Sequence, residues 1–189
     1  FSFFPSKNLG GMGDGGMVVT RDDQLAEKLR KLRNHGAAPK YYHSMVGGNF
    51  RLDPIQAAVL SVKLQYLEEW HQKRQENAEY YKKNLNLDAL TTPENAYRPE
   101  YHIYNQFIIS VKGDREELKT FLRKKQIGFG VYYPVPFHKQ ECFEYLGYQD
   151  GDFPKSEYAA EHTLALPIYP ELSVEMQDYI IDALHEFFE

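Results

Sequence analysis

The chain has 189 residues, of which 42% are hydrophobic and 15% aromatic, so it can bury a core and is globular rather than disordered. Its 22 basic and 27 acidic side chains give a formal charge of −5 and are mixed along the sequence, which argues against a nucleic-acid-binding surface. No stretch has the apolar length of a membrane-spanning helix, and the single cysteine, Cys142, excludes an internal disulfide. We therefore expect a cytoplasmic protein with neither nucleic acid nor membrane as a partner.

The first twenty residues combine an aromatic run, one lysine and a cluster of glycines. Residues 1–4 predict a short buried strand that Pro5 ends, and residues 17–20 predict a second strand. Five glycines between positions 10 and 16 let the chain turn tightly between them, which places Lys7 on a rigid turn and partly shields it from water. Amines attack carbonyls in the neutral form, which burial or a nearby cation favours. Lys7 is therefore the candidate for an imine-forming lysine.

Other interpretations of this segment compete with that one. Gly11–Gly16 matches the G-x-G-x-x-G pattern of dinucleotide-binding proteins, but there a helix follows the glycines, whereas Val18 and Val19 predict a strand. A phosphate-binding P-loop has its lysine after the glycines and not before them. An exposed loop with a solvated lysine fits the aromatic neighbours and the glycine density less well. A dinucleotide-binding oxidoreductase module stays as a weaker alternative.

A first helix is predicted after this segment. Asp22 or Asp23 can cap it, and a face of leucines continues to about Asn34. Residues 37–52 then predict a polar loop that contains glycine.

The next signal predicts a long helix. Asp53 is a strong N-cap residue, Pro54 suits the first helical position, and Gln56 stands where a capping-box partner would. The apolar pattern that follows predicts one continuous helix to about Asn84.

The rest of the chain predicts a small α+β unit behind a proline-containing linker at 91–100. The expected elements are strands at 104–111 and 128–133 and helices near 114–126, 154–164 and 174–188.

Further motifs follow the lysine loop in a fixed order, namely His35–Gly36, Gly48–Ala58, Tyr132–His138 and Leu166–Pro170. Together they closely resemble the DegT/DnrJ/EryC1/StrS family of sugar aminotransferases, whose members carry pyridoxal 5′-phosphate on the lysine. The resemblance covers nearly the whole chain but only the C-terminal half of such an enzyme. It implies an α/β fold of type I: the end of the large cofactor-binding domain at 1–53, a long bridging helix at 54–90 and a small α+β domain at 91–189.

The resemblance also implies which residues form the site. Lys7 would bind the cofactor, Ser2 would lie beside it, and Asn49 would reach the cofactor phosphate in the neighbouring subunit of a homodimer. An ordinary strand serine and a turn asparagine are the alternatives for Ser2 and Asn49. Arg51 can bind a phosphate or carboxylate with two hydrogen bonds, or form an ion pair with Asp53.

The C-terminal part supplies further candidates for substrate binding. Tyr132, Tyr133 and His138 surround a proline-rich turn and suit a sugar ring and a diphosphate, although an aromatic core with a surface histidine is the alternative. His102 begins a segment that is similar to a His-x-Tyr segment of the family. The other histidines show no metal-ligand spacing, so no metal site is expected.

The implied function is transamination of a nucleotide-linked keto-sugar by an amino acid donor, with glutamate as the expected donor. A lysine rather than a histidine at position 7 favours transamination over dehydration within this family. Asn105 and Gln106 resemble the family members that aminate carbon 3 of the sugar more than those that act at carbon 4. A non-catalytic module, which dimerises through the Asn49 loop and the long helix, is the alternative from another class.

Overall fold

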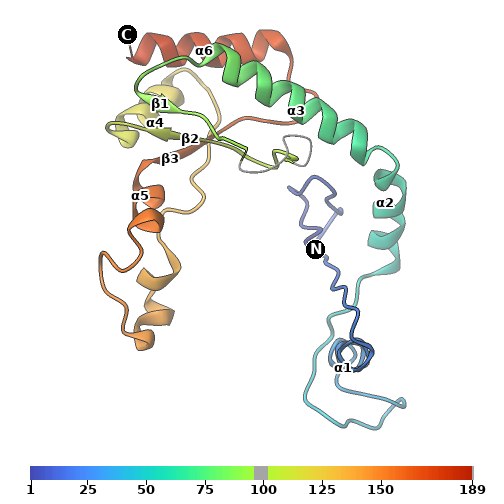
Figure 1. The fold of residues 1–189 in the computed structure, drawn as a ribbon. Coiled ribbons are helices and arrows are strands. Elements are labelled where there is room, and N and C mark those ends of the chain that lie inside the picture. The colour runs from blue at the N-terminus through green and yellow to red at the C-terminus, as the bar shows by residue number, and fades with distance from the viewer. Residues whose placement is uncertain (96–101, 189) are drawn as a thin grey trace. The chain divides into compact units, whose positions relative to one another are not determined.

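The structure is a computed structural model that describes residues 1–95 and 102–188. The chain forms two compact units, Phe1–Glu68 and Glu69–Glu189 (Figure 1). The first unit contains the helices α1 (Asp23–Leu32) and α2 (Pro54–Leu64). Helix α3 (Leu67–Asn84) begins at the boundary and lies mainly in the second unit. The second unit continues with β1 (Leu90–Thr91), β2 (Phe107–Val111), α4 (Arg115–Lys124), the 3₁₀ turns η2 (Phe137–Lys139) and η3 (Glu141–Leu146), α5 (Pro154–His162), β3 (Thr163–Leu166) and α6 (Val174–Phe188).

The start of the first unit is a folded loop and not a sheet. Ser2 and Gly16 form a single β-bridge, and the Phe3 N–H donates to the Gly15 carbonyl at 2.8 Å. The prediction of strands at 1–4 and 17–20 is therefore wrong for the described residues, because one bridge is not a repeated ladder of hydrogen bonds.

Helix α1 begins where the sequence indicates. The Asp22 side chain accepts hydrogen bonds from the N–H groups of Gln24 and Leu25 at 2.9 and 3.0 Å, which satisfies donors that the first helical turn leaves open. The helix ends at Leu32, two residues before the predicted end. Gly36 then has a φ of +71°, and a Cβ atom there would lie 1.8 Å from the Met45 carbonyl oxygen, so the turn requires glycine.

The expected single helix from Pro54 to Asn84 is wrong, since the chain forms α2 and α3 with a break between them. The Tyr66 N–H donates to the Lys63 carbonyl at 3.0 Å, three residues back instead of the four of an α-helix, and this tighter turn interrupts the helix. The boundary between the two compact units follows at Glu68.

The second unit has an antiparallel sheet in the order β1-β2-β3. Phe107 pairs with Leu166 and Ile109 with Leu164, and the alternating residues of β2 are fully buried. The prediction of a strand at 128–133 is wrong, because the backbone there makes a single bridge between Gly130 and Ala165.

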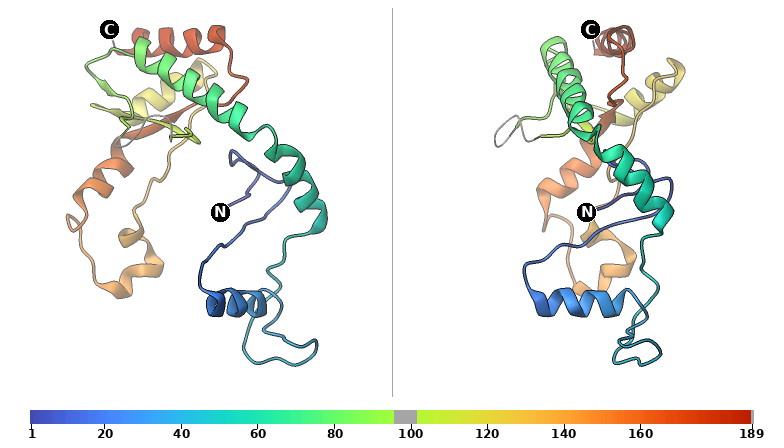
Figure 2. Two further views of the ribbon diagram at one scale, coloured as in Figure 1. Left: turned by 45° about the vertical axis from the view of Figure 1, so that its right-hand side comes forward. Right: turned by 90° about the vertical axis from the view of Figure 1, so that its right-hand side faces the viewer.

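Helices α3 and α6 lie side by side in this unit (Figure 2). The Tyr80 hydroxyl donates to Asp178 at 2.6 Å, and the amide of the buried Gln177 donates to the Asn77 carbonyl at 2.9 Å. The predictions of helices near 114–126, 154–164 and 174–188 are confirmed within a few residues. None of the helices in the described residues combines the length and hydropathy that crossing a membrane requires.

Candidate functional site

The lysine loop is tightly folded around its glycines. The Lys7 N–H donates to the Phe4 carbonyl at 2.9 Å and the Gly11 N–H to the Phe3 carbonyl at 2.8 Å. Gly10 is buried, and a Cβ atom there would lie 2.3 Å from the Pro5 carbonyl oxygen, so only glycine fits the close approach of the two chain segments. The turn that the sequence predicts around Lys7 is therefore present.

The amine of Lys7 is accessible. Its side chain is exposed, and within residues 1–95 and 102–188 its Nζ atom has no hydrogen-bond or ion-pair partner. The expected partial shielding from water is thus not supplied by the described residues, since Lys7 is exposed among them. An unengaged amine on a backbone-braced turn is what a carbonyl-bearing cofactor needs in order to attach.

Helix α2 braces this loop from one side, which sequence reasoning missed. The Gln56 Oε1 atom accepts a hydrogen bond from the Met12 N–H at 2.7 Å, and the Lys63 Nζ atom donates to the Gly10 carbonyl at 2.5 Å. The expected capping box is therefore wrong: Asp53 makes no side-chain capping bond, and Gln56 binds the loop instead. The sequence does contain a signal for these contacts. Gln56 and Lys63 are seven residues apart, which places their polar side chains on one face of a mostly apolar helix.

Asn49 and Arg51 are brought together. The Arg51 Nε–H donates to the Asn49 Oδ1 atom at 2.8 Å, and a β-bridge pairs Asn34 with Asn49. Both side chains are exposed, and the described residues contain no ion pair between Arg51 and Asp53. The bond occupies the amide oxygen of Asn49, so its NH₂ group and the terminal guanidinium nitrogens of Arg51 remain as donors for an anionic group.

Ser2 stands at the start of the same unit. Its hydroxyl oxygen accepts a long hydrogen bond of 3.4 Å from the Phe4 N–H, so the hydroxyl proton is left to donate elsewhere. The side chain is exposed, as is that of Lys7 five residues later.

His102 belongs to a cluster in the second unit. Its ring packs at a tilt of 40° against the Tyr104 ring, with centroids 4.0 Å apart. Its Nδ1 atom accepts from the Tyr104 N–H at 3.1 Å, and the Tyr104 hydroxyl accepts from Lys82 at 2.7 Å. Burial, followed by the positive charge of Lys82, lowers the pKa of His102 below its ordinary value.

We expect His102→Asn to flatten the acid end of the stability profile of the second unit. Because the folded pKa of His102 lies below its unfolded value of 6.5, the unfolded state binds more protons, so stability is kept above that value and lost as the pH falls through the folded pKa. Asparagine keeps an acceptor for the Tyr104 N–H but does not titrate. Urea denaturation followed by the fluorescence of Trp70 between pH 8 and pH 5 measures this, and an unchanged acid loss would contradict the assignment.

His138 is engaged with Glu157 rather than free. The side chain of His138 is 6% exposed and that of Glu157 is 16% exposed. The His138 Nε2 atom lies 2.9 Å from Glu157 Oε1, and the His138 ring packs against Phe153. Burial raises the pKa of Glu157, but hydrogen bonds from the Gly151 N–H, His138 and the Phe153 N–H outweigh it, so the pKa lies below its ordinary value. This pair holds the segment around η2 and η3 to the start of α5.

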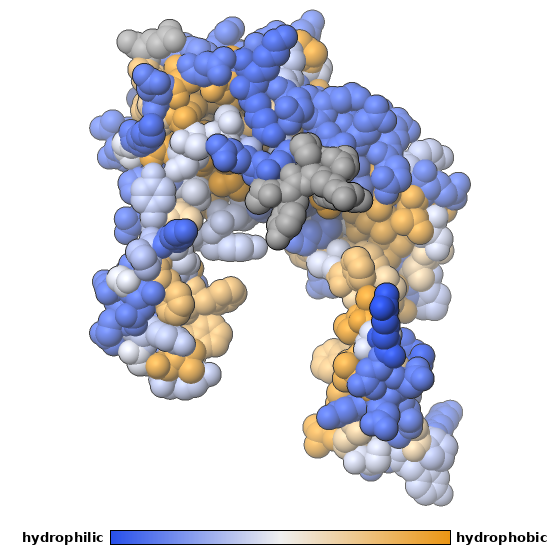
Figure 3. Space-filling view, viewed as in Figure 1, coloured by the Kyte–Doolittle hydropathy of each residue, from blue (hydrophilic) through white to orange (hydrophobic). Residues whose placement is uncertain are grey.

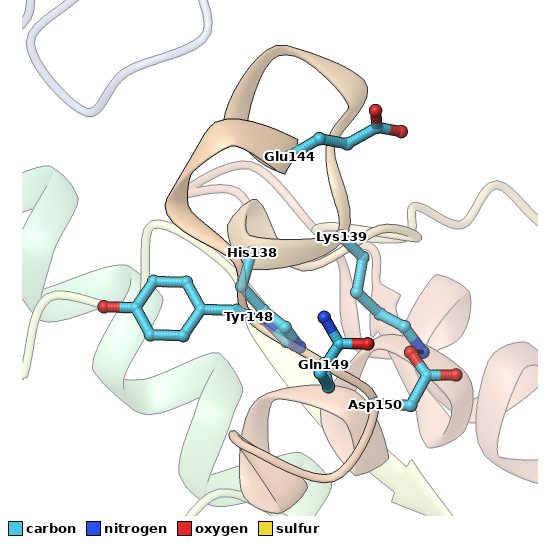
Figure 4. Close-up of a pocket in the computed structure, with 6 residues that line it drawn as sticks. All are labelled: His138, Lys139, Glu144, Tyr148, Gln149 and Asp150. Carbon is cyan, nitrogen blue, oxygen red and sulfur yellow. Dashed lines mark ion pairs between the residues drawn. The ribbon is translucent and has the colours of Figure 1, made fainter.

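An open pocket of about 680 Å³ lies beside His138 (Figure 4). Lys139 and Asp150 face one another across it in an ion pair of 2.9 Å, while the carboxylate of Glu144 points away. The lysine charge is neutralised by its partner, and the other residues that line the pocket include no further lysine or arginine. This pocket therefore offers little to a diphosphate, which needs unpaired cations.

Tyr132 and Tyr133 lie on an exposed turn, with their rings edge to face at 5.8 Å. Figure 3 shows apolar surface over the segment that follows them, where Phe137 and Leu146 are exposed to 78% and 49%. Neither tyrosine belongs to the buried core, so the alternative of an aromatic core is wrong for these two residues. Among the residues that the structure describes, no three His, Cys, Asp or Glu side chains gather to hold a metal ion.

The lysine loop, the helices α2 and α3 and the small α+β unit have the mixed helix-and-sheet fold of the C-terminal half of fold type I aminotransferases. The chain belongs to the DegT/DnrJ/EryC1/StrS aminotransferase family, whose model matches residues 1–185. The glycines at 11–16 are followed by α1 only from Asp23, which removes the dinucleotide-binding alternative.

Known proteins of this family are similar along all or nearly all of the chain. A "Pleiotropic regulatory protein" of Geobacillus stearothermophilus is 46% identical over 100% of the chain and 51% of its own length. The UDP-N-acetyl-3-dehydro-alpha-D-glucosamine 3-aminotransferase of Acidithiobacillus ferrooxidans is 42% identical over 93% and 46%. The crystal structure of DesV from S. venezuelae is 39% identical, with a TM-score of 0.92 over 100% of the chain and 51% of DesV. The chain thus spans about half the length of these relatives.

Proposed function

We propose that the protein, with its upstream half, transfers an amino group from an amino acid, glutamate in our prediction, to a nucleotide-linked keto-sugar. The observation that carries this proposal is the exposed amine of Lys7, which has no partner among the residues that the structure describes, on a glycine-rich turn in a chain of this family. Amination at carbon 3 is supported by the 3-aminotransferase relative, which is 42% identical.

The residues present fit pyridoxal phosphate. Lys7 would hold it covalently, the Ser2 hydroxyl would donate to it, and the NH₂ group of Asn49 would bind its phosphate across the interface of a homodimer. When bound, this cofactor supplies the electron sink that stabilises the carbanion of the transamination.

The side chains of the chain would then orient the reactants and move the proton. Once released from the cofactor, the Lys7 Nζ atom would accept the proton from the α-carbon of the donor and would return one to the acceptor side. Arg51 would bind an anionic group of a substrate through its terminal guanidinium nitrogens, while Tyr132 and Tyr133 would offer their rings to the sugar nucleotide.

His102 and His138 stay as predicted substrate-binding residues, but their contacts limit what they can do. His138 already bonds to Glu157, so it would act by fixing the loop or by exchanging that partner. His102 has its Nδ1 atom engaged with the Tyr104 N–H, so only its Nε2 atom is left for a ligand.

A second candidate, a non-catalytic dimerisation module, is favoured by the apolar surface of the loop that carries Asn49. Val46 is exposed to 95% and Phe50 to 75%, which is costly unless a partner covers them. This candidate predicts assembly without covalent capture of the cofactor.

The experiment that separates the two candidates is covalent trapping. The full-length protein is incubated with pyridoxal phosphate, reduced with borohydride and digested, and the adduct is located by peptide mass. We expect the adduct on Lys7 in the unsubstituted protein and no such adduct in Lys7→Ala. Labelling that is spread evenly over many lysines and is unchanged by Lys7→Ala would contradict the catalytic proposal and favour the dimerisation module.

A further inference from the structure

The lysine loop has two anchors on α2 that are independent of its own turn. Gln56 accepts from the Met12 N–H at 2.7 Å and Lys63 donates to the Gly10 carbonyl at 2.5 Å, and both side chains are partly buried. The anchored groups lie on either side of Gly11, whose missing side chain leaves room for the Gln56 oxygen: a Cβ atom at Gly11 would lie 2.9 Å from it. Figure 2 shows the first residues of the chain beside α2.

These anchors restrict the segment that carries Lys7. The Lys7 N–H is bound to the Phe4 carbonyl on one side, and Gly10 is fixed to α2 only three residues further on. A short segment held at both ends has few backbone conformations left, so the starting point of the lysine side chain is fixed. Without the α2 contacts, the glycines would leave the loop free to adopt many conformations.

We propose that Gln56 and Lys63 are positioning residues for the reaction of Lys7, an inference that rests on the proposed function. They touch neither cofactor nor substrate and act through the backbone of Gly10 to Met12. The rigid helix transmits its position to the lysine, because proton transfer needs the amine within hydrogen-bond reach of the reacting carbon. A loosened loop still carries the lysine but presents it in the correct place less often, so turnover falls while substrate affinity is kept.

Variants at Gln56 test this in the full-length protein. Gln56→Ala removes the acceptor for the Met12 N–H. Gln56→Glu keeps an acceptor oxygen at the same distance along the side chain. Gln65→Ala is the matched control, because Gln65 is an exposed residue at the end of the same helix.

The first measurement is hydrogen exchange of the Gly10–Gly16 amides without cofactor. We expect Gln56→Ala to raise the exchange rate at Met12 about tenfold, and Gln56→Glu and Gln65→Ala to change it by less than about twofold. The second measurement is steady-state kinetics, where Gln56→Ala is expected to lower kcat about tenfold with KM within about twofold, and Gln56→Glu to restore kcat.

The exchange rates and the kinetics together test whether Gln56 positions Lys7. Faster exchange with an unchanged kcat, or an equal loss of kcat in the alanine and glutamate variants, would overturn the positioning role. Unchanged exchange in Gln56→Ala would show that the anchor does not hold the loop and would overturn it as well. Absence of an adduct on Lys7 in the unsubstituted protein would instead overturn the proposed function, and the exchange result would still stand on its own.

Discussion

Lys7→Ala is expected to lower kcat of the full-length protein by about four orders of magnitude, since the substitution removes both the covalent anchor and the group that moves the proton. The Lys7 amine has no partner among the described residues, so its loss breaks no internal contact and the fold should persist. Single-turnover measurements of amino transfer from the donor, made at saturating pyridoxal phosphate, test this directly.

Two controls keep that result interpretable. Lys28→Ala removes an exposed lysine of α1 and should leave kcat within about twofold. A small primary amine added to Lys7→Ala should restore part of the rate, because a free base can replace the missing proton acceptor. Retention of more than about a tenth of the turnover in Lys7→Ala would rule out Lys7 as the general base.

Arg74→Met is expected to be the most destabilising single change in the second unit. Arg74 is 9% exposed, and its Nη1 atom donates to the carbonyls of Tyr104 at 3.0 Å and Ile168 at 2.8 Å. Burial lowers the pKa of Arg74, and the charge of Glu171 offsets part of that effect. Methionine fills similar space but leaves both carbonyls without this donor, so we expect the free energy of unfolding to fall by about 3 kcal/mol.

The fluorescence of Trp70, on the same helix, measures this change during urea denaturation. Lys83→Met, on the exposed side of α3, is the matched control and should shift the free energy of unfolding by less than about 0.5 kcal/mol. Equal shifts for the two variants would show that the bonds from Arg74 to Tyr104 and Ile168 add nothing to stability.

Several features follow from local rules and could be predicted. Asp22 caps α1 because its carboxylate reaches amides two and three residues ahead, a geometry that depends on no distant part of the chain. The strand at Phe107–Val111 follows from a run of aromatic and β-branched residues that favour an extended backbone. The lysine, the glycines after it and the ordered motifs were enough to indicate the family, which the comparisons confirm.

Other features needed the folded chain. The amide that Gln56 binds lies 44 residues earlier in the sequence, and one carbonyl that Arg74 binds lies 94 residues later. Gln56 has a chemically sound local partner in a capping box, so the sequence favours the wrong contact. The choice depends on which backbone group the fold brings close.

The absence of strands at 1–4, 17–20 and 128–133 has the same origin. Apolar and aromatic residues there satisfy the propensity for a strand, but a strand forms only where a neighbouring backbone runs alongside with donors and acceptors to pair. Composition and motif order thus determined the family and the lysine loop. Tertiary structure alone decided which backbone groups meet, because hydrogen bonds between distant residues depend on positions in space that no local pattern encodes.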